Sequence, residues 1–239
     1  MKFTEAQLEK AFAELLENEN FPHHLGETIA RAADEVLIEQ DLKRIFDYIS
    51  PNTINNSAFS HRIYELLLRT CTEFENNARA ILQSNGYSMK SNLKINRDYF
   101  KINQALKLDG YEVRLNIWDS SPLSIAPFSA WNTTTYQPLQ WYQNYNSVKH
   151  NRSANFHLAN LETLIQAISG LFIILYSQFE CKAFNPYGSI SMINDDRIFL
   201  SVSGGLFEIK PYLWSQTENY SFDWDTLKNS SNPFQSYSF

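Results

Sequence analysis

The sequence predicts a mainly α-helical protein: a helical bundle preceded by a two-helix appendage and followed by a small β-hairpin. Two observations predict this fold class. In long stretches of the first 185 residues, apolar residues recur at spacings of three and four, the period of a helix with one buried face. In residues 186–239 they alternate with polar residues as in strands, with Gly204-Gly205 as the expected turn of a hairpin before an aromatic C-terminal extension.

Residues 1–50 are expected to form an acidic helical appendage. Two amphipathic helices are predicted here, and the second ends at Pro51. Residues 1–48 contain 11 acidic and 5 basic residues, so the whole net charge of −6 falls in this segment. Between Ser84 and Arg152, in contrast, eight basic residues face four acidic ones, a local surplus that could suit a phosphate backbone.

Residues 51–185 are expected to form the helical bundle. One long helix follows Ser60, a typical N-cap residue, and ends near Gly86. A shorter helix is predicted over 96–107, and the strongest helix of the chain from Ala154 onward, with "LFIILY" apolar all round and therefore in the middle of the bundle. A strand between them should place four alternating residues on one side: Tyr111, Val113, Leu115 and Ile117.

Missing motifs exclude several classes of protein. The chain has no glycine-rich phosphate-binding or dinucleotide-binding motif, no HExxH zinc motif and no nucleophile elbow. Cys71 and Cys181 are too few for a disulfide framework and lack the spacing of a zinc site, so we expect no metal and no cofactor. The N-terminus does not resemble a signal peptide, and the longest apolar run, "GLFIILY", is too short to span a bilayer. We therefore expect a cytoplasmic protein without membrane contact.

The densest chemistry lies in "WYQNYNSVKHNRSANFHLANLETL", residues 141–164. Arg152 and His157 are separated by four residues and come directly before the apolar helix. Together with the helices from about Phe46 to Phe179, this pattern resembles the HEPN families, α-helical domains whose ribonuclease members carry Arg, four to six residues, then His. The resemblance implies an HEPN-like bundle, metal-independent ribonuclease activity and a homodimer, since HEPN nucleases commonly build one site across two subunits.

The expected chemistry requires these residue types. In RNA cleavage without a metal, the ribose 2′-hydroxyl attacks the adjacent phosphate, a histidine transfers protons, and a cation stabilises the charge on the phosphoryl oxygens. His157 and Arg152 are the candidate catalytic pair. On one ideal helix they would diverge by about 140°, so Arg152 must precede the first regular turn or two subunits must combine. The candidate substrate-binding residues are His150, Lys149, Asn146 and Asn151.

A structural alternative exists for the same stretch. Asn151 or Ser153 could simply cap the helix, Arg152 could be a solvated charge in its first turn, and His150 could hydrogen-bond to neighbouring backbone. However, a first-turn arginine lies at the unfavourable end of the helix dipole, so the helix itself gives it no reason to be there.

A second candidate site lies in "NDDRIFLSVSGGLFEIK". Asp196 opens one expected strand, and Glu208 and Lys210 share a face of the next. This arrangement is similar to the skeleton of metal-dependent PD-(D/E)xK nucleases, in which carboxylates hold Mg²⁺ and the lysine orients a water. Such pairs are common on exposed strands, and Pro211 and the lack of a flanking α/β pattern argue against this site.

Residues Phe3 to Phe46 resemble the extreme N-terminus of type I restriction-enzyme motor subunits, through a helix, "GETIAR" and "EVLIEQDLKRI". Neither the nuclease nor the ATPase motor of that family is included, so the resemblance implies only a restriction or defence context. The leading interpretation is a ribonuclease or RNA-binding effector of a bacterial defence or toxin system, with RNA, a second copy and a defence-system protein as expected partners. The alternative is a catalytically inactive HEPN-type interaction module that docks a partner through four aromatic residues: Trp131, Tyr136, Trp141 and Tyr142.

Overall fold

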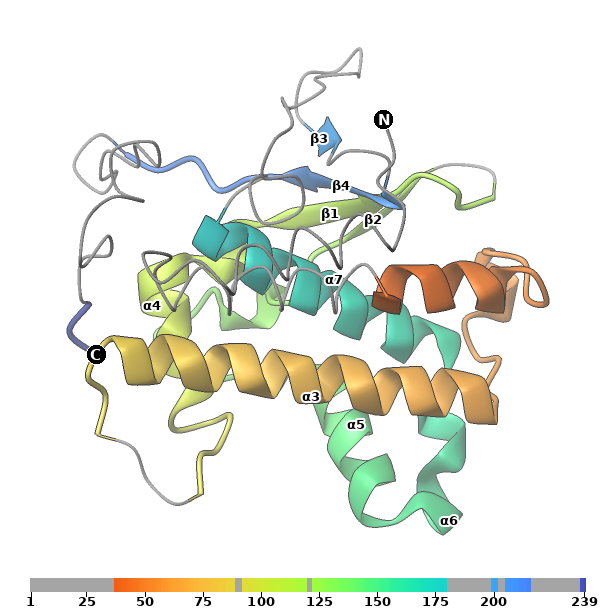
Figure 1. Cartoon of the computed structure of the whole chain (residues 1–239), viewed down its shortest axis with the longest axis horizontal. Helices are drawn as coiled ribbons and strands as arrows, with labels where there is room; N and C mark the ends of the chain where they lie inside the picture. Colours follow the sequence, from red (N-terminus) through yellow and green to blue (C-terminus); the bar gives the residue numbers. More distant parts are fainter. Residues whose placement is uncertain (1–36, 89–91, 120–121, 180–198, 202–204, 216–236) are drawn as a thin grey trace, which may run out of the picture.

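The computed structural model describes residues 37–88, 92–119, 122–179, 199–201, 205–215 and 237–239. Within these residues the chain is mostly helical with a small antiparallel sheet, which confirms the mainly α-helical class (Figure 1). The first expected helix, Asp196 and Gly204 lie outside the described residues. The α-helices are residues 37–46, α3 (His61–Ser84), α4 (Ile102–Leu106), α5 (Gln140–His150), α6 (Arg152–Asn155) and α7 (Leu161–Phe179). The strands are β1 (Glu112–Leu115), β2 (Leu123–Ile125), β3 (Leu200–Ser201) and β4 (Phe207–Lys210).

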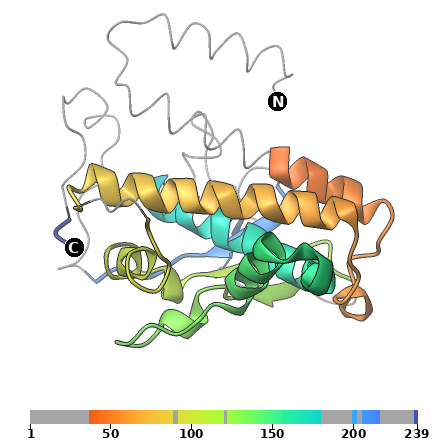
Figure 2. The same cartoon turned by 90° about the horizontal axis from the view of Figure 1, so that it is seen from below.

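Helix α3 begins and ends where the sequence predicts. The Ser60 hydroxyl accepts a hydrogen bond from the backbone N–H of Ile63 at 3.2 Å, which satisfies one of the free donors at the helix start. Beyond the last turn Gly86 takes a positive φ of 69°, a conformation that costs glycine nothing. One face of the helix is buried over its whole length, and Figure 2 shows α3 lying along α7.

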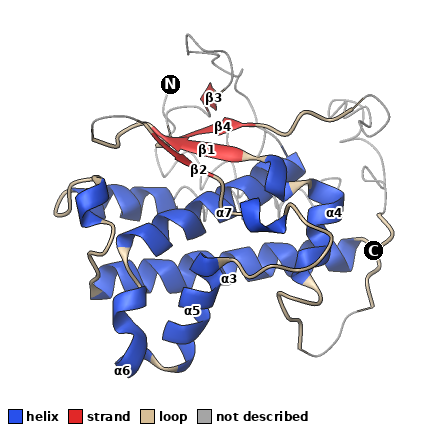
Figure 3. Ribbon diagram, turned by 180° about the vertical axis from the view of Figure 1, so that it is seen from behind, coloured by secondary structure: helices blue, strands red, loops and turns tan. Residues whose placement is uncertain are grey.

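Helix α7 runs through the middle of the fold, as its all-round apolar sequence predicts. Figures 1 and 3 show α3 on one side of it and the sheet on the other. The six residues Leu171 to Tyr176 are each 5% exposed or less. Residues Leu161–Gln178 are long and apolar enough to cross a membrane, but 78% of this stretch is buried inside the protein, which is the environment of a core helix.

The start of α7 differs from the prediction. The helix begins at Leu161 rather than at Ala154, because Asn160 caps it by accepting a hydrogen bond from the Thr163 N–H at 2.9 Å. The backbone N–H groups of Leu161 and Glu162 donate to carbonyl oxygens of the loop before α3, at 2.9 and 3.1 Å. The residues before Asn160 form the separate turns of α6 and η5 (Phe156–Leu158) instead.

Of the four aromatic residues proposed as a docking surface, three belong to the core and Tyr136 is half-buried against it. Trp131, Trp141 and Tyr142 are 1%, 4% and 5% exposed, so they cannot present rings to a partner. The Trp141 indole donates to the carbonyl of Pro127 at 3.0 Å and packs against Gly170 of α7. A Cβ at Gly170 would lie 3.2 Å from Trp141, so glycine at this position lets α5 approach α7 closely.

The four strands form one antiparallel sheet in the order β2-β1-β4-β3 (Figure 3). β3 and β4 form the expected hairpin, and β4 also pairs with β1, so the described C-terminal strands share a sheet with the centre of the chain. Val113 and Leu115 are buried as predicted, but Ile117 is 42% exposed and Trp118 is buried in its place. The strand stops at Leu115, and the following turn breaks the alternation.

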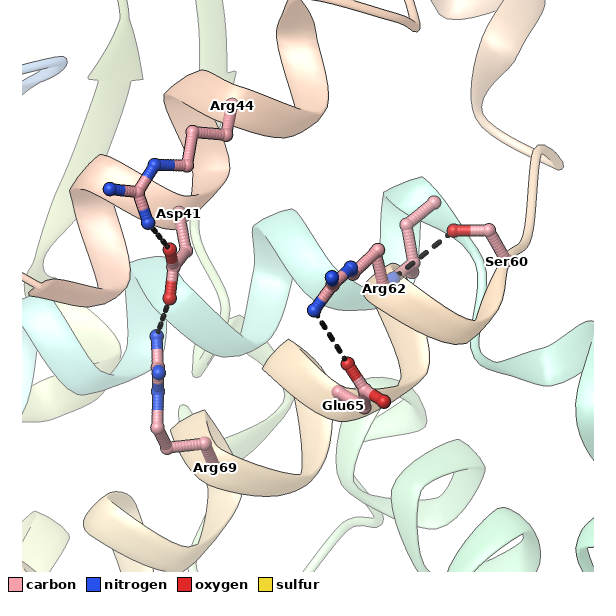
Figure 4. Close-up of polar contacts among 7 residues, drawn as sticks. Asp41, Arg44, Ser60, Arg62, Glu65 and Arg69 are labelled. Carbon is pink, nitrogen blue, oxygen red and sulfur yellow. Dashed lines mark hydrogen bonds and ion pairs between the residues drawn. The ribbon is translucent and has the colours of Figure 1, made fainter.

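The helix at residues 37–46 is attached to α3 by an ion pair (Figure 4). Asp41 accepts from Arg44 on its own helix at 2.7 Å and from Arg69 on α3. Burial alone would raise the pKa of the Asp41 carboxyl, but the two guanidinium groups outweigh it and lower the pKa. Near the start of α3, Figure 4 shows Arg62 directed towards Glu65, 3.3 Å away.

The connection between α3 and α4 is fixed by one buried carboxylate. Asp98 is fully buried and accepts hydrogen bonds from the Tyr87 hydroxyl, the Lys94 N–H and the Arg97 guanidinium, at 2.7 to 3.0 Å. Burial by itself would raise its pKa, but these donors outweigh burial and hold the pKa at about 2.

We expect this network to make stability dependent on acid. Because the pKa of Asp98 falls from 3.8 to about 2 on folding, its contribution is complete above about pH 4 and is lost as the pH falls towards 2. The contribution amounts to roughly 2 kcal/mol. Urea unfolding should show Asp98→Asn less stable than the parent at pH 7, with a smaller difference at pH 3. Asp109→Asn on a nearby turn is the control, and an equal effect of the two variants at pH 7 would contradict the prediction.

Candidate functional site

The segment between α5 and α7 folds into a tight corner held by its own asparagines. The Asn151 side chain accepts from the Ala154 N–H at 3.3 Å and so caps α6, as the structural alternative proposed. Asn155 donates to the carbonyl oxygens of Ser147 and Asn151, at 3.2 and 3.0 Å, and satisfies acceptors at the end of α5. Figures 1 and 3 show this corner at the end of the molecule that lies away from the sheet.

Arg152 and His157 both lie on this corner, ahead of the long helix. Arg152 is the first residue of α6, and His157 is the central residue of η5. Since the two residues are on separate short turns, the divergence of about 140° on a single ideal helix does not apply. Both side chains are exposed, and within the described part of the chain no hydrogen bond or ion pair engages the side chain of His157.

Among the residues that the structure describes, the Arg152 guanidinium lies against aromatic rings and not against an acid. Its Cζ lies 5.1 Å from the centre of the Tyr64 ring on α3 and 5.5 Å from that of the Phe156 ring on η5. Aromatic faces attract a guanidinium through its flat side, which leaves the N–H edges available to an anion. The cation is therefore held in place without being neutralised.

Phe156 is the centre of a surface cluster that sequence analysis did not find. Phe59, His61 and Tyr64, all near the start of α3, place their rings 5.5, 4.9 and 5.9 Å from the Phe156 ring. We call these four residues and Arg152 the Phe156 cluster.

The cluster lies at the surface and joins two segments of the chain. Phe59 is 49% exposed, and an isolated β-bridge between Phe59 and Asn160 connects the start of α3 to the segment before α7. The sequence shows Phe59 and His61 on either side of the Ser60 cap, but the Phe156 ring that they contact lies almost 100 residues further along the chain.

The remaining predicted site residues have different environments. The Lys149 ammonium donates to the Tyr145 hydroxyl at 2.7 Å and lies 3.6 Å from Glu75 of α3, so it is directed to the interface of α3 and α5. His150 is exposed and Asn146 half-buried, and within the described residues no side-chain hydrogen bond engages either. Of the basic residues proposed to contact substrate, His150 is thus the more available.

In the second candidate site, Lys210 forms an ion pair across the sheet. Glu208 and Lys210 do share a face of β4, opposite Arg114 and Glu112 of β1. The pKa of the Glu112 carboxyl is lowered mainly by its hydrogen bond with the Ser124 hydroxyl and also by Lys210, which lies 3.1 Å away. Glu208 is only 5% exposed. The described residues contain no group of three His, Cys, Asp or Glu side chains able to hold a metal. This face therefore offers little to a Mg²⁺-dependent reaction.

A cleft of about 330 Å³ lies where the first turns of α5 and α7 meet. Trp141, Gln140, Asn144 and Thr163 contribute to its lining, and none of the six predicted site residues does. Two of its amides bond to neighbours within the lining, since Gln140 donates to Asn144 and Asn144 to Thr163, each at 2.9 Å. The cleft is separate from the exposed Arg152 corner.

No protein-family model, curated protein or solved structure matches the chain. The side chains themselves therefore carry the functional argument, together with the resemblances found in the sequence.

Proposed function

We propose that the chain is a metal-independent endoribonuclease that acts on single-stranded RNA, with Arg152 and His157 in its active site. One observation carries this proposal: within the described residues, a guanidinium without an acidic partner lies against two aromatic rings and shares an exposed corner with an imidazole that makes no hydrogen bond. Arg152 would stabilise the charge on the phosphoryl oxygens, and His157 would transfer a proton.

The surroundings of the pair favour an unpaired strand as substrate. An exposed ring such as Phe59 offers a stacking surface to a base that is free of its duplex partner. His150, at the end of α5, adds a group that could contact the next phosphate. The HEPN resemblance supports pairing of two copies at this corner, and the resemblance of residues 3–46 to restriction motor subunits supports a defence or toxin context.

The proposal is tested by incubating the purified chain with a fluorescent single-stranded RNA in EDTA. We expect cleavage that leaves a 2′,3′-cyclic phosphate, and no cleavage of DNA of the same sequence, because the nucleophile is the 2′-hydroxyl. RNA that stays intact at all protein concentrations would refute the nuclease. Cleavage that occurs only with Mg²⁺ would direct attention to Glu208 instead.

A further inference from the structure

His61 lies on the same aromatic ring as Arg152, although 91 positions separate the two residues in the sequence. It is the first residue of α3, and its exposed imidazole is 4.9 Å from the Phe156 ring at an angle of 37°. The Arg152 guanidinium is 5.5 Å from the centre of that ring. The imidazole and the guanidinium are therefore within about 10 Å of each other, since both distances share the same ring centre.

This upper limit leaves room for a phosphodiester. A hydrogen bond at each side of a phosphate, with the P–O bonds between them, spans about 6–8 Å, which is within the limit, so one phosphate could contact both groups at once. Ser60 caps the first turn of α3, on which His61 lies, and the His61 imidazole packs against the Phe156 ring. The geometry is thus set by packing within one chain.

RNA cleavage requires two proton transfers on opposite sides of the phosphorus. A base removes the proton of the 2′-hydroxyl as the 2′-oxygen bonds to phosphorus, and an acid protonates the 5′-oxygen as its bond to phosphorus breaks. The products are a 2′,3′-cyclic phosphate and a 5′-hydroxyl. In an in-line displacement a single imidazole cannot reach both oxygens at once, so within one chain His157 leaves one transfer without a carrier.

We propose that His61 is the second proton carrier of this site, so that His61 and His157 perform the two transfers on either side of a phosphate held by Arg152. The inference rests on the proposed function. It also means that one chain supplies both imidazoles, whereas the HEPN pattern of one Arg and one His would need the His157 of a second copy for the second transfer.

His61→Phe is the decisive variant, because phenylalanine preserves the aromatic contact with Phe156 and removes proton transfer. We expect His61→Phe and His61→Ala to lower the rate of RNA cleavage by about 10²–10⁴-fold. Their affinity for a 2′-O-methyl oligonucleotide of the same sequence, which cannot be cleaved, should change less than about threefold. Arg62→Ala, one residue further along α3 and paired with Glu65, is the matched control and should cleave as the parent does.

The outcomes separate this inference from the function on which it rests. If His61→Phe cleaves RNA at the parental rate while Arg152→Ala and His157→Ala do not, His61 is only a packing residue and the inference is wrong, whereas the nuclease stands. If the parent protein leaves RNA intact, the proposed function is wrong, and the inference about His61 is wrong with it. A substrate with sulfur in place of the 5′-oxygen needs no acid, so restored cleavage by His61→Phe would identify His61 as the proton donor.

Discussion

Replacement of Arg152 by alanine is expected to lower kcat/KM for RNA cleavage by about 10²–10³-fold, the usual effect of removing one group that stabilises charge in the transition state. The rate of Arg152→Lys should lie between those of the parent and Arg152→Ala, because lysine keeps the charge but lacks the flat guanidinium and its two parallel N–H groups. Initial rates on one RNA in EDTA measure the effect.

Folding of the Arg152 variants must be checked separately. The contacts with the two rings are exposed, so their loss should reduce the free energy of unfolding by about 0.5–1 kcal/mol, and the protein should remain folded. Arg62→Ala removes a nearby arginine that is paired with Glu65 and should leave the rate unchanged. Equal rates for Arg152→Ala and the parent would show that the guanidinium has no part in the reaction.

Phe74→Ala should cause the largest loss of stability, about 3–5 kcal/mol, the usual cost of removing a fully buried phenylalanine side chain. Phe74 on α3 is 0% exposed, and its ring centre lies 5.3 to 6.5 Å from those of four others. These rings connect α3 to α5, to the short helix η2 (Tyr99–Lys101) and to the loop after β2: Tyr99, Phe128, Trp141 and Tyr142. The free energy of unfolding in urea measures the effect.

Two further variants show whether the loss comes from the cavity. Phe74→Leu keeps most of the volume and should cost less than Phe74→Ala. Tyr48→Ala removes an aromatic side chain that is 90% exposed and should change stability by less than about 0.5 kcal/mol. If Phe74→Ala and Tyr48→Ala had equal effects, the packing of aromatic rings between α3 and α5 would not be what holds these elements together.

The parts of the fold that the sequence predicts correctly are those set by interactions between residues close together in the chain. Ser60 caps α3, Gly86 follows its end with a positive φ, and "LFIILY" is buried all round, because capping and helical periodicity involve residues only a few positions apart. The later start of α7 had a local signal as well. Asn160 is a good capping residue, but the apolar period ran through it and concealed the break.

Where the expectation failed, a contact distant in sequence decided the outcome. Trp131 and Trp141 were expected to present their rings to a partner, yet both are buried: Trp131 packs against Phe100, and Trp141 packs against Phe74 and Gly170. Similarly, alternation predicted the hairpin of β3 and β4, but not that β4 would pair with β1. Strand alternation specifies a buried face and says nothing about which strand lies alongside.

The candidate site likewise combines residues that are close in sequence with residues that only the packing of helices brings together. The order of residues along the chain already places Arg152, His157 and His150 within eight residues of one another, directly before an apolar helix. Only the tertiary structure brought His61, Tyr64 and Phe59 to the same corner, because the helices α3 and α7 pack side by side and Phe156 reaches across to the start of α3. The periodicity of apolar residues predicts which side of a helix is buried, whereas the segment that covers this side is determined by packing between residues almost 100 positions apart.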